Sequence, residues 1–134
     1  MAENSDITKI QKHCMDTSDN DFETMEHLFQ SKDYHWALFM WHIVVEKILK
    51  ACVVRKTLAH APFTHDLTRL AKVSGIEFSN DQLDWMDTIT TFNMNARYDS
   101  YKQSFYLKCT PEFTKEWVEK IKILRSWIKE TQFK

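Results

Sequence analysis

The sequence predicts an all-α fold, an up-and-down bundle of four to five helices. Two observations carry this prediction: the chain has one Gly and two Pro in 134 residues, and its apolar side chains recur at helical spacing. Tight turns use the backbone freedom of Gly or the fixed φ of Pro, so a chain this poor in both has few of the turns that connect strands. The length fits one domain that can bury a core of its own.

The first predicted helix covers residues 19–31. Its apolar stripe consists of Phe22, Met25, Leu28 and Phe29. Ser18 followed by Asp21 is typical of a capping box, which would start the helix at this point. We therefore expect residues 1–17 to form a flexible or short helical tail, and residues 18–134 to form the bundle.

The strongest helical pattern lies in residues 33–57, and Ser31 or Asp33 is expected to cap this helix. Its inner face consists of Leu38, Trp41, Val45, Ile48, Leu49 and Cys52, widened by Phe39, Ile43 and Val53. An apolar face this wide indicates a helix that is buried on two sides. Glu46 and Lys50, one turn apart, are expected to form an ion pair on the remaining face.

Helix boundaries are marked clearly in the second half of the chain. Thr64 is expected to cap a short helix over residues 65–74, and Gly75 to end it in the left-handed conformation. Ser79, with a glutamine three positions later, is typical of a capping box that opens the next helix, which ends near residue 94.

Residues 95–110 show no clear helical period, and we expect them to be irregular. They contain three tyrosines, a phenylalanine and an arginine, which makes them the expected binding surface. Thr110 and Pro111 then indicate the start of a final helix that runs to about residue 131, because Pro is tolerated at the first helical position.

Composition excludes several classes of protein. The net charge of −1 gives no whole-molecule attraction to nucleic acid or acidic membranes. Three widely spaced cysteines, without CxxC or zinc spacing, indicate reduced thiols and no metal site. No apolar stretch approaches the roughly 20 residues of a membrane span, and the polar N-terminus lacks the features of a secretory signal. We expect a cytoplasmic protein without metal or cofactor.

Charge is distributed unevenly along the chain. Residues 1–33 carry eight acidic against three basic side chains, whereas residues 44–72 carry six basic against two acidic ones. Each segment can be a solvated helix face. The basic segment can also form a local anion site, to which Lys47 and Lys50, one turn apart, would contribute.

Three segments, in the same order, resemble the HEPN (higher eukaryotes and prokaryotes nucleotide-binding) family. Residues 34–51 end in Val-Glu-Lys-Ile-Leu-Lys-Ala, which is similar to the VEKxLKA signature of the family's second helix. Residues 64–70 contain His-Asp-Leu and a further leucine, which resemble the HxLxxL opening of its third helix. Residues 95–101, Asn-Ala-Arg-Tyr-Asp-Ser-Tyr, resemble the ARYPDY block of its non-ribonuclease branch.

This resemblance implies a binding and interaction module that forms a homodimer and binds nucleotide or phosphate. It also implies cooperation with a separate small nucleotidyltransferase protein in a toxin–antitoxin-like or defence system. The expected ligand-binding residues are Asn95, Arg97, Tyr98, Asp99, Tyr101, Lys47 and Lys50. An arginine presents a fixed fork to a phosphate, and tyrosine rings stack on bases.

The sequence departs from the ribonuclease members of the family, which use an Arg-x4–6-His pair after the fourth helix. No histidine follows Arg97, and Asp99 and Ser100 stand where the ARYPDY block has Pro and Asp. Unperturbed Tyr and Lys titrate near 10, so they are poor bases at neutral pH. We therefore expect no efficient catalysis, with Arg97 the one catalytic candidate. A metal-independent, toxin-like ribonuclease that acts on RNA remains the alternative.

A second alternative is a structural scaffold, in which Arg97 pairs with Asp99 or Glu46. For the histidines we expect structural roles. His42 is expected to form a surface hydrogen bond with Glu46, and His65 to form a hydrogen bond near the start of a helix.

Overall fold

Helices account for nearly all of the chain in the computed structural model, which describes residues 4–133 and, of residues 4, 5, 99 and 100, the backbone alone. The helices are α1 (Asn4–Gln30), α2 (Tyr34–Thr57), α3 (Leu67–Ser74), α4 (Asn80–Arg97), α5 (Asp99–Lys108) and α6 (Pro111–Gln132). Residues 4–133 contain no strand, so the predicted all-α class is confirmed. The described residues form six helices, one more than the upper number that the sequence predicts.

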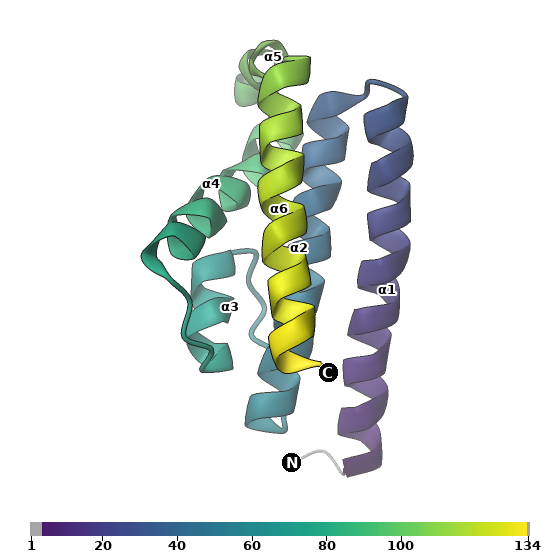
Figure 1. Ribbon diagram of the computed structural model, residues 1–134, viewed down its shortest axis with the longest axis vertical. Coiled ribbons are helices and arrows are strands. Elements are labelled where there is room, and N and C mark those ends of the chain that lie inside the picture. Colours follow the sequence, from purple (N-terminus) through teal and green to yellow (C-terminus); the bar gives the residue numbers. More distant parts are fainter. Residues whose placement is uncertain (1–3, 134) are drawn as a thin grey trace.

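The centre of the bundle is α2, which contacts each of the helices α1, α3, α4, α5 and α6. Figure 1 shows α1, α2 and α6 running along the long axis of the molecule, with α3 and α4 to one side of them. The predicted inner face of α2 is buried, as is Val53, whereas Phe39 and Ile43 are half-buried. Burial of α2 on both sides, expected from its wide apolar face, is therefore confirmed.

The predicted start of the first helix, near residue 19, is wrong: α1 begins at Asn4. Ser18 does not cap a helix; it is buried within α1, and its hydroxyl donates to the carbonyl oxygen of Val44 at 2.9 Å. Ile7 is only 5% exposed, so the apolar side of α1 continues past the predicted start. Packing against α2 thus extends the helix where the local pattern is weak. The division into a tail and a bundle stays a prediction.

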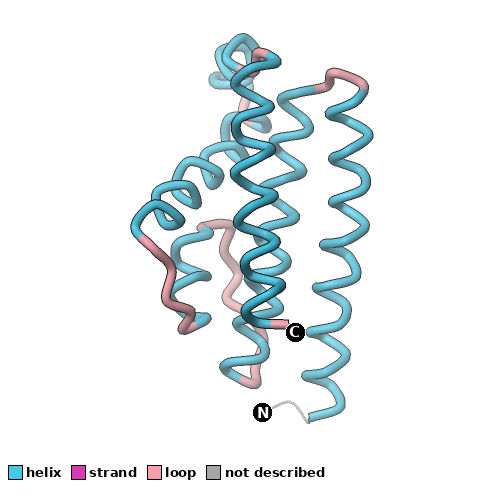
Figure 2. Tube along the Cα trace, in the orientation of Figure 1, coloured by secondary structure: helices cyan, strands magenta, loops and turns pink. Residues whose placement is uncertain are grey.

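Most of the predicted helix ends in the middle of the chain are confirmed. Gly75 ends α3 with a φ of 74°, and Ser79 forms a reciprocal capping box with Gln82 at 2.9 and 3.1 Å. The start of α3 differs from the prediction, because Asp66 and not Thr64 accepts the backbone N–H groups of the first turn. Figure 2 shows the loop that joins α2 to α3 lying along the bundle before this turn.

The prediction of an irregular segment over residues 95–110 is wrong. Helix α4 continues to Arg97, the chain leaves helical geometry at Tyr98 (φ −92°, ψ 126°), and α5 follows directly. Phe105 holds α5 on the bundle by packing its ring 5.6 Å from that of Phe92 on α4. Among the described side chains of residues 98–110, only Phe105 and Cys109 are buried, so this part of the chain lacks the apolar stripe that reveals a helix in a sequence.

The three cysteines form no disulfide. Burial raises the pKa of both Cys52 and Cys109 to about 12, so these two thiols are protonated and unreactive in the folded protein. Within the part of the chain that the structure describes, no group of His, Cys, Asp and Glu side chains could hold a metal ion. No helix among the same residues is long and apolar enough to cross a membrane.

Candidate functional site

Glu46 lies at the centre of a polar network between α2 and the loop before α3. It is only 7% exposed, although the sequence places it on the solvated face of α2. One carboxylate oxygen is 2.7 Å from Nδ1 of His65, and the other accepts a 2.9 Å hydrogen bond from Nζ of Lys50. The predicted ion pair of Glu46 and Lys50 is therefore confirmed. The second oxygen of the same carboxylate holds the imidazole of His65 in place.

His42 is fully buried one turn before Glu46, so the expected surface hydrogen bond between the two is wrong. Its Nε2 is 3.9 Å from the carboxylate and 2.8 Å from the backbone carbonyl oxygen of His65, to which it donates. Its Nδ1 lies 3.3 Å from the amide nitrogen of Asn93 on α4 and accepts from it. One buried ring thus joins α2 to both α4 and the loop before α3.

Burial lowers the pKa of His42, and the positive charges of His65 and Arg97 act in the same direction. The hydrogen bond to the His65 carbonyl and the charge of Glu46 oppose them. A neutral imidazole fits these contacts, because it donates from one nitrogen and accepts at the other. The contact between His42 and Asn93 places α4 against the network four residues before Arg97.

Lowering the pH is expected to destabilise the protein through His42. A histidine of the unfolded chain titrates near pH 6.5, whereas the folded-state pKa is lower. The stability that neutral His42 contributes is therefore complete above about pH 6.5 and is lost as the pH falls through the folded-state pKa. Melting temperatures between pH 7.5 and 5.5 should fall less for His42→Gln than for the wild type.

The matched control is His13→Gln, because His13 is exposed on α1. This variant should keep the wild-type dependence of the melting temperature on pH. Equal losses of melting temperature in the wild type and in His42→Gln would contradict the role given to His42.

The structure gathers four of the predicted site residues at the junction of α4 and α5. Arg97 is exposed and its guanidinium lies 5.6 Å from the centre of the Tyr98 ring. Tyr98 and Tyr101 are exposed as well, and Asn95 is half-buried. Arg97 forms no ion pair with the described carboxylates, so the expected pairing with Glu46 is absent; the side chain of Asp99 lies outside the described residues.

Lys47 and Lys50 are both engaged elsewhere. Nζ of Lys47 lies 2.5 Å from the carboxylate of Asp21, which joins α2 to α1, and Lys50 is held by Glu46. Part of the basic charge of residues 44–72 is thus neutralised by ion pairs. The partner of Lys47, Asp21, belongs to the acidic segment of residues 1–33.

Sequence reasoning missed Asn93 and gave the wrong environment to His42 and Glu46. These groups come from positions up to 51 residues apart, so no local spacing reveals that they meet. Within the sequence, the one indication of this network was His65, because it belongs to the His-Asp-Leu motif that resembles the HEPN family.

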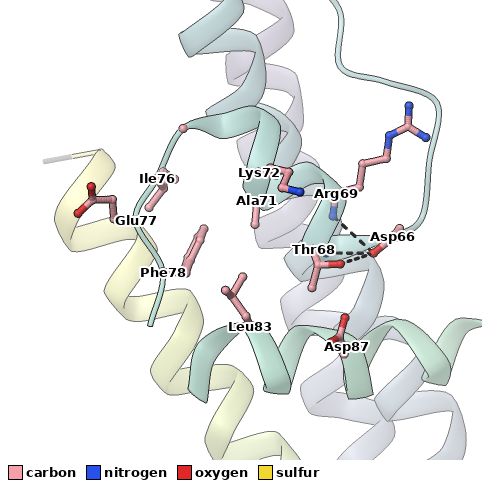
Figure 3. A pocket seen from close by; sticks show the side chains of 11 residues that line it. Asp66, Thr68, Arg69, Ala71, Lys72, Ile76, Glu77, Phe78, Leu83 and Asp87 are labelled. Carbon is pink, nitrogen blue, oxygen red and sulfur yellow. Dashed lines mark hydrogen bonds between the residues drawn. The ribbon is translucent and has the colours of Figure 1, made fainter. Parts of the chain in front are cut away.

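A hollow of about 900 Å³ lies elsewhere, between α3, α4 and the connection that joins them (Figure 3). Apolar side chains such as Phe78 and Leu83 line it together with charges of both signs. The carboxylate of Asp66 at its rim is occupied by the first turn of α3, as the dashed lines in Figure 3 show. None of the predicted site residues reaches this hollow.

The described residues thus form a bundle of six helices, in which the exposed Arg97 and Tyr98 follow the part of α4 that Asn93 ties to the buried His42. The family model of the HEPN domain matches residues 11–131. The chain therefore belongs to the HEPN domain family, a finding that supports a nucleotide-related or RNA-related module. No curated protein and no solved structure matches the chain.

Proposed function

We propose that this protein binds the phosphate of a nucleotide or of RNA through Arg97. The observation that carries the proposal is the exposed guanidinium of Arg97, which has no ion-pair partner among the described carboxylates and lies over the ring of Tyr98. A guanidinium presents paired N–H donors in a plane that matches a phosphate, and exposed tyrosine rings such as that of Tyr101 offer faces on which a base stacks.

The buried network supports this proposal by holding the end of α4 in place. The hydrogen bond between Asn93 and His42 lies one turn before Arg97 and ties α4 to the central helix. A binding residue is most effective when its own element is rigid before the ligand arrives, because less conformational entropy is lost on binding. Arg97 thus projects from a fixed helix end, next to the short break at Tyr98.

Arg97→Ala is expected to weaken nucleotide binding about 10- to 100-fold, because a charge-assisted, two-pronged hydrogen bond to phosphate is lost. Calorimetric titration with AMP, ATP and inorganic phosphate measures this effect. Arg97→Lys keeps the charge but loses the fork, so its affinity should lie between those of wild type and Arg97→Ala. Lys115→Ala, which removes an exposed cation from α6, should leave affinity unchanged.

Two outcomes contradict the proposal. One is a wild-type protein that binds none of these ligands. The other is an Arg97→Ala variant with unchanged affinity and a lowered melting temperature, which would make Arg97 a structural residue of a helical scaffold.

A ribonuclease remains the second candidate, because His65, which belongs to the His-Asp-Leu motif, is hydrogen-bonded to a carboxylate and would supply the histidine that is missing after Arg97. The side chain of His65 is 56% exposed and its Nδ1 is bonded to Glu46, which leaves Nε2 for a proton transfer. A histidine oriented by a carboxylate is a suitable general base. RNA should then be cleaved by the wild type and by neither His65→Ala nor Arg97→Ala; intact RNA with the wild type excludes this candidate.

We further propose that the chain belongs to the ARYPD-like branch, forms a homodimer and acts with a small nucleotidyltransferase in a toxin–antitoxin-like or defence system. The branch rests on the block at residues 95–101, and the partner and process on the family resemblance. Exposed apolar side chains support dimerisation, among them Leu107 at 68% and Ile123 at 59% exposure. Sedimentation at several concentrations tests the dimer, and a strict monomer would contradict it.

A further inference from the structure

Two adjoining hollows lie between the start of α2 and the outer side of α5. Their volumes are about 430 and 270 Å³, and both are lined by His35 and Tyr106. Lys102 and Gln103 complete the first hollow, and Lys32 contributes to the second. Lys102, Gln103 and Tyr106 lie in the segment that the sequence predicts as the binding surface, whereas His35 and Lys32 were not expected to contribute.

The walls of the hollows offer aromatic surface. Tyr106 is 60% exposed and stands nearly perpendicular to the ring of His35, with the ring centres 5.2 Å apart and an interplanar angle of 75°. The ring of Tyr106 is therefore held by a protein ring, while much of the residue stays exposed to a ligand. An exposed tyrosine ring held in this way is a platform on which any nucleobase can stack.

The charge of the hollows is positive. Lys102 lies one turn before Tyr106 on α5, with Nζ 5.1 Å from the centre of the Trp36 ring. Neither Lys102 nor Lys32 forms an ion pair with a carboxylate among residues whose side chains the structure describes, in contrast to Lys47 and Lys50. Burial and the charge of Lys102 lower the pKa of His35, and Asp33 is the acidic group that opposes them.

These hollows also lie within reach of the Arg97 site. Arg97 precedes α5 and Tyr106 lies near its end, nine residues later. The part of this segment that lies on α5, from Asp99 to Tyr106, covers about 10 Å at a rise of about 1.5 Å per residue, and only Tyr98 separates α5 from Arg97. The triphosphate chain of a nucleotide, or the backbone that links two nucleotides, can bridge such a separation. One extended ligand can therefore contact both places.

We propose that the hollows beside Tyr106 bind an unpaired nucleobase of the ligand whose phosphate Arg97 contacts, with Lys102 and Lys32 neutralising further phosphates. This inference rests on the proposed function and adds the place and chemistry of base recognition. The shared chemistry is a base joined to several phosphates, which both a nucleoside triphosphate and single-stranded RNA provide. Stacking recognises any base, so the site is expected to tolerate different sequences.

Tyr106→Ala should weaken the binding of base-bearing ligands roughly 5- to 100-fold, because stacking of one base is lost. The ligands are ATP, a fluorescently labelled single-stranded RNA of eight residues, and inorganic triphosphate, which has the charge but no base. Calorimetry measures the affinity of the first and last, and fluorescence anisotropy that of the RNA. Tyr106→Ala should leave the affinity for inorganic triphosphate unchanged, and Tyr106→Phe should keep base stacking. Lys102→Gln should weaken all three.

Phe63→Ala is the matched control, because it removes a fully exposed aromatic ring from the loop between α2 and α3 and should change no affinity. Tyr106 is exposed as well, so its replacement is expected to keep the fold, which circular dichroism checks. A loss confined to ATP or confined to RNA supports the proposal and identifies the source of the base.

Other results would overturn the proposal. Unchanged affinities in Tyr106→Ala and Lys102→Gln, together with a loss in Arg97→Ala, would remove the base site and leave the proposed phosphate site intact. An equal loss of inorganic triphosphate and ATP in Tyr106→Ala would also remove it, because the ring would then not act on the base. A wild-type protein that binds none of the three ligands would end both proposals.

Discussion

Replacing Trp41 with alanine is expected to lower the free energy of unfolding by about 3–5 kcal/mol. Trp41 is fully buried on α2, the helix that contacts each of the other five, and the ring of Phe22 from α1 packs edge-on against it at 5.0 Å. Truncation would leave a cavity between the first two helices, and the rigid flanking helices can collapse into it only in part. Urea unfolding followed by circular dichroism measures the change.

Trp41→Phe provides the control. The indole Nε1 of Trp41 is buried and makes no hydrogen bond, so its removal sacrifices no polar contact. We therefore expect Trp41→Phe to destabilise the protein by much less than Trp41→Ala. A loss below about 1 kcal/mol in Trp41→Ala would contradict the central position of α2, since surface substitutions have effects of this size.

Phe92→Ala is expected to destabilise the protein by a similar amount, about 3–5 kcal/mol, and also to impair the candidate site. The Phe92 ring is 2% exposed and lies 5.6 Å from the rings of both Phe105 on α5 and Trp117 on α6. Phe105 and Cys109 are the only buried residues among the described side chains of residues 98–110, which include Tyr106. Removing the partner of Phe105 should therefore loosen α5 as well as lower global stability.

This prediction is tested by two measurements on Phe92→Ala: urea unfolding and hydrogen exchange of the α5 amides. The exchange of α5 should rise more than that of α2, because α5 has few other contacts with the core. Phe92→Leu, which keeps an apolar side chain at this position, should show smaller changes in both measurements. Uniform exchange across the bundle would contradict the dependence of α5 on Phe92.

The helices that the sequence predicts well are those whose signals are local. Gly75 ends α3 because a left-handed residue is needed there, and Ser79 starts α4 through its own hydroxyl. The wide apolar face of α2 also revealed its central place. Each of these features depends on residues within a few positions of one another.

Tertiary contacts decide the elements that the sequence did not reveal. The first half of α1 is helical although few of its residues are apolar, because side chains such as Ile7 are covered in the bundle. Among the described side chains of α5, Tyr101 and Tyr106 are exposed and only Phe105 is buried, so the apolar pattern of this helix resembles that of a loop.

The candidate site was predictable in part. The Arg-Tyr pair at residues 97 and 98 stood out because it follows a helix and resembles a family block. The contacts of Glu46 with His65 and of His42 with Asn93 were not predictable, because they join residues 19 and 51 positions apart. The hollows beside Tyr106 were hidden for the same reason, since they form only where α5 meets the start of α2.

Diffraction from crystals of the intact protein grown with ATP tests the central claim most directly. We expect density for a phosphate group with its oxygens about 2.7–2.9 Å from the guanidinium nitrogens of Arg97. Density for the nucleotide at another place, with the Arg97 guanidinium bound instead to a carboxylate of the protein, would contradict the proposed role of this residue.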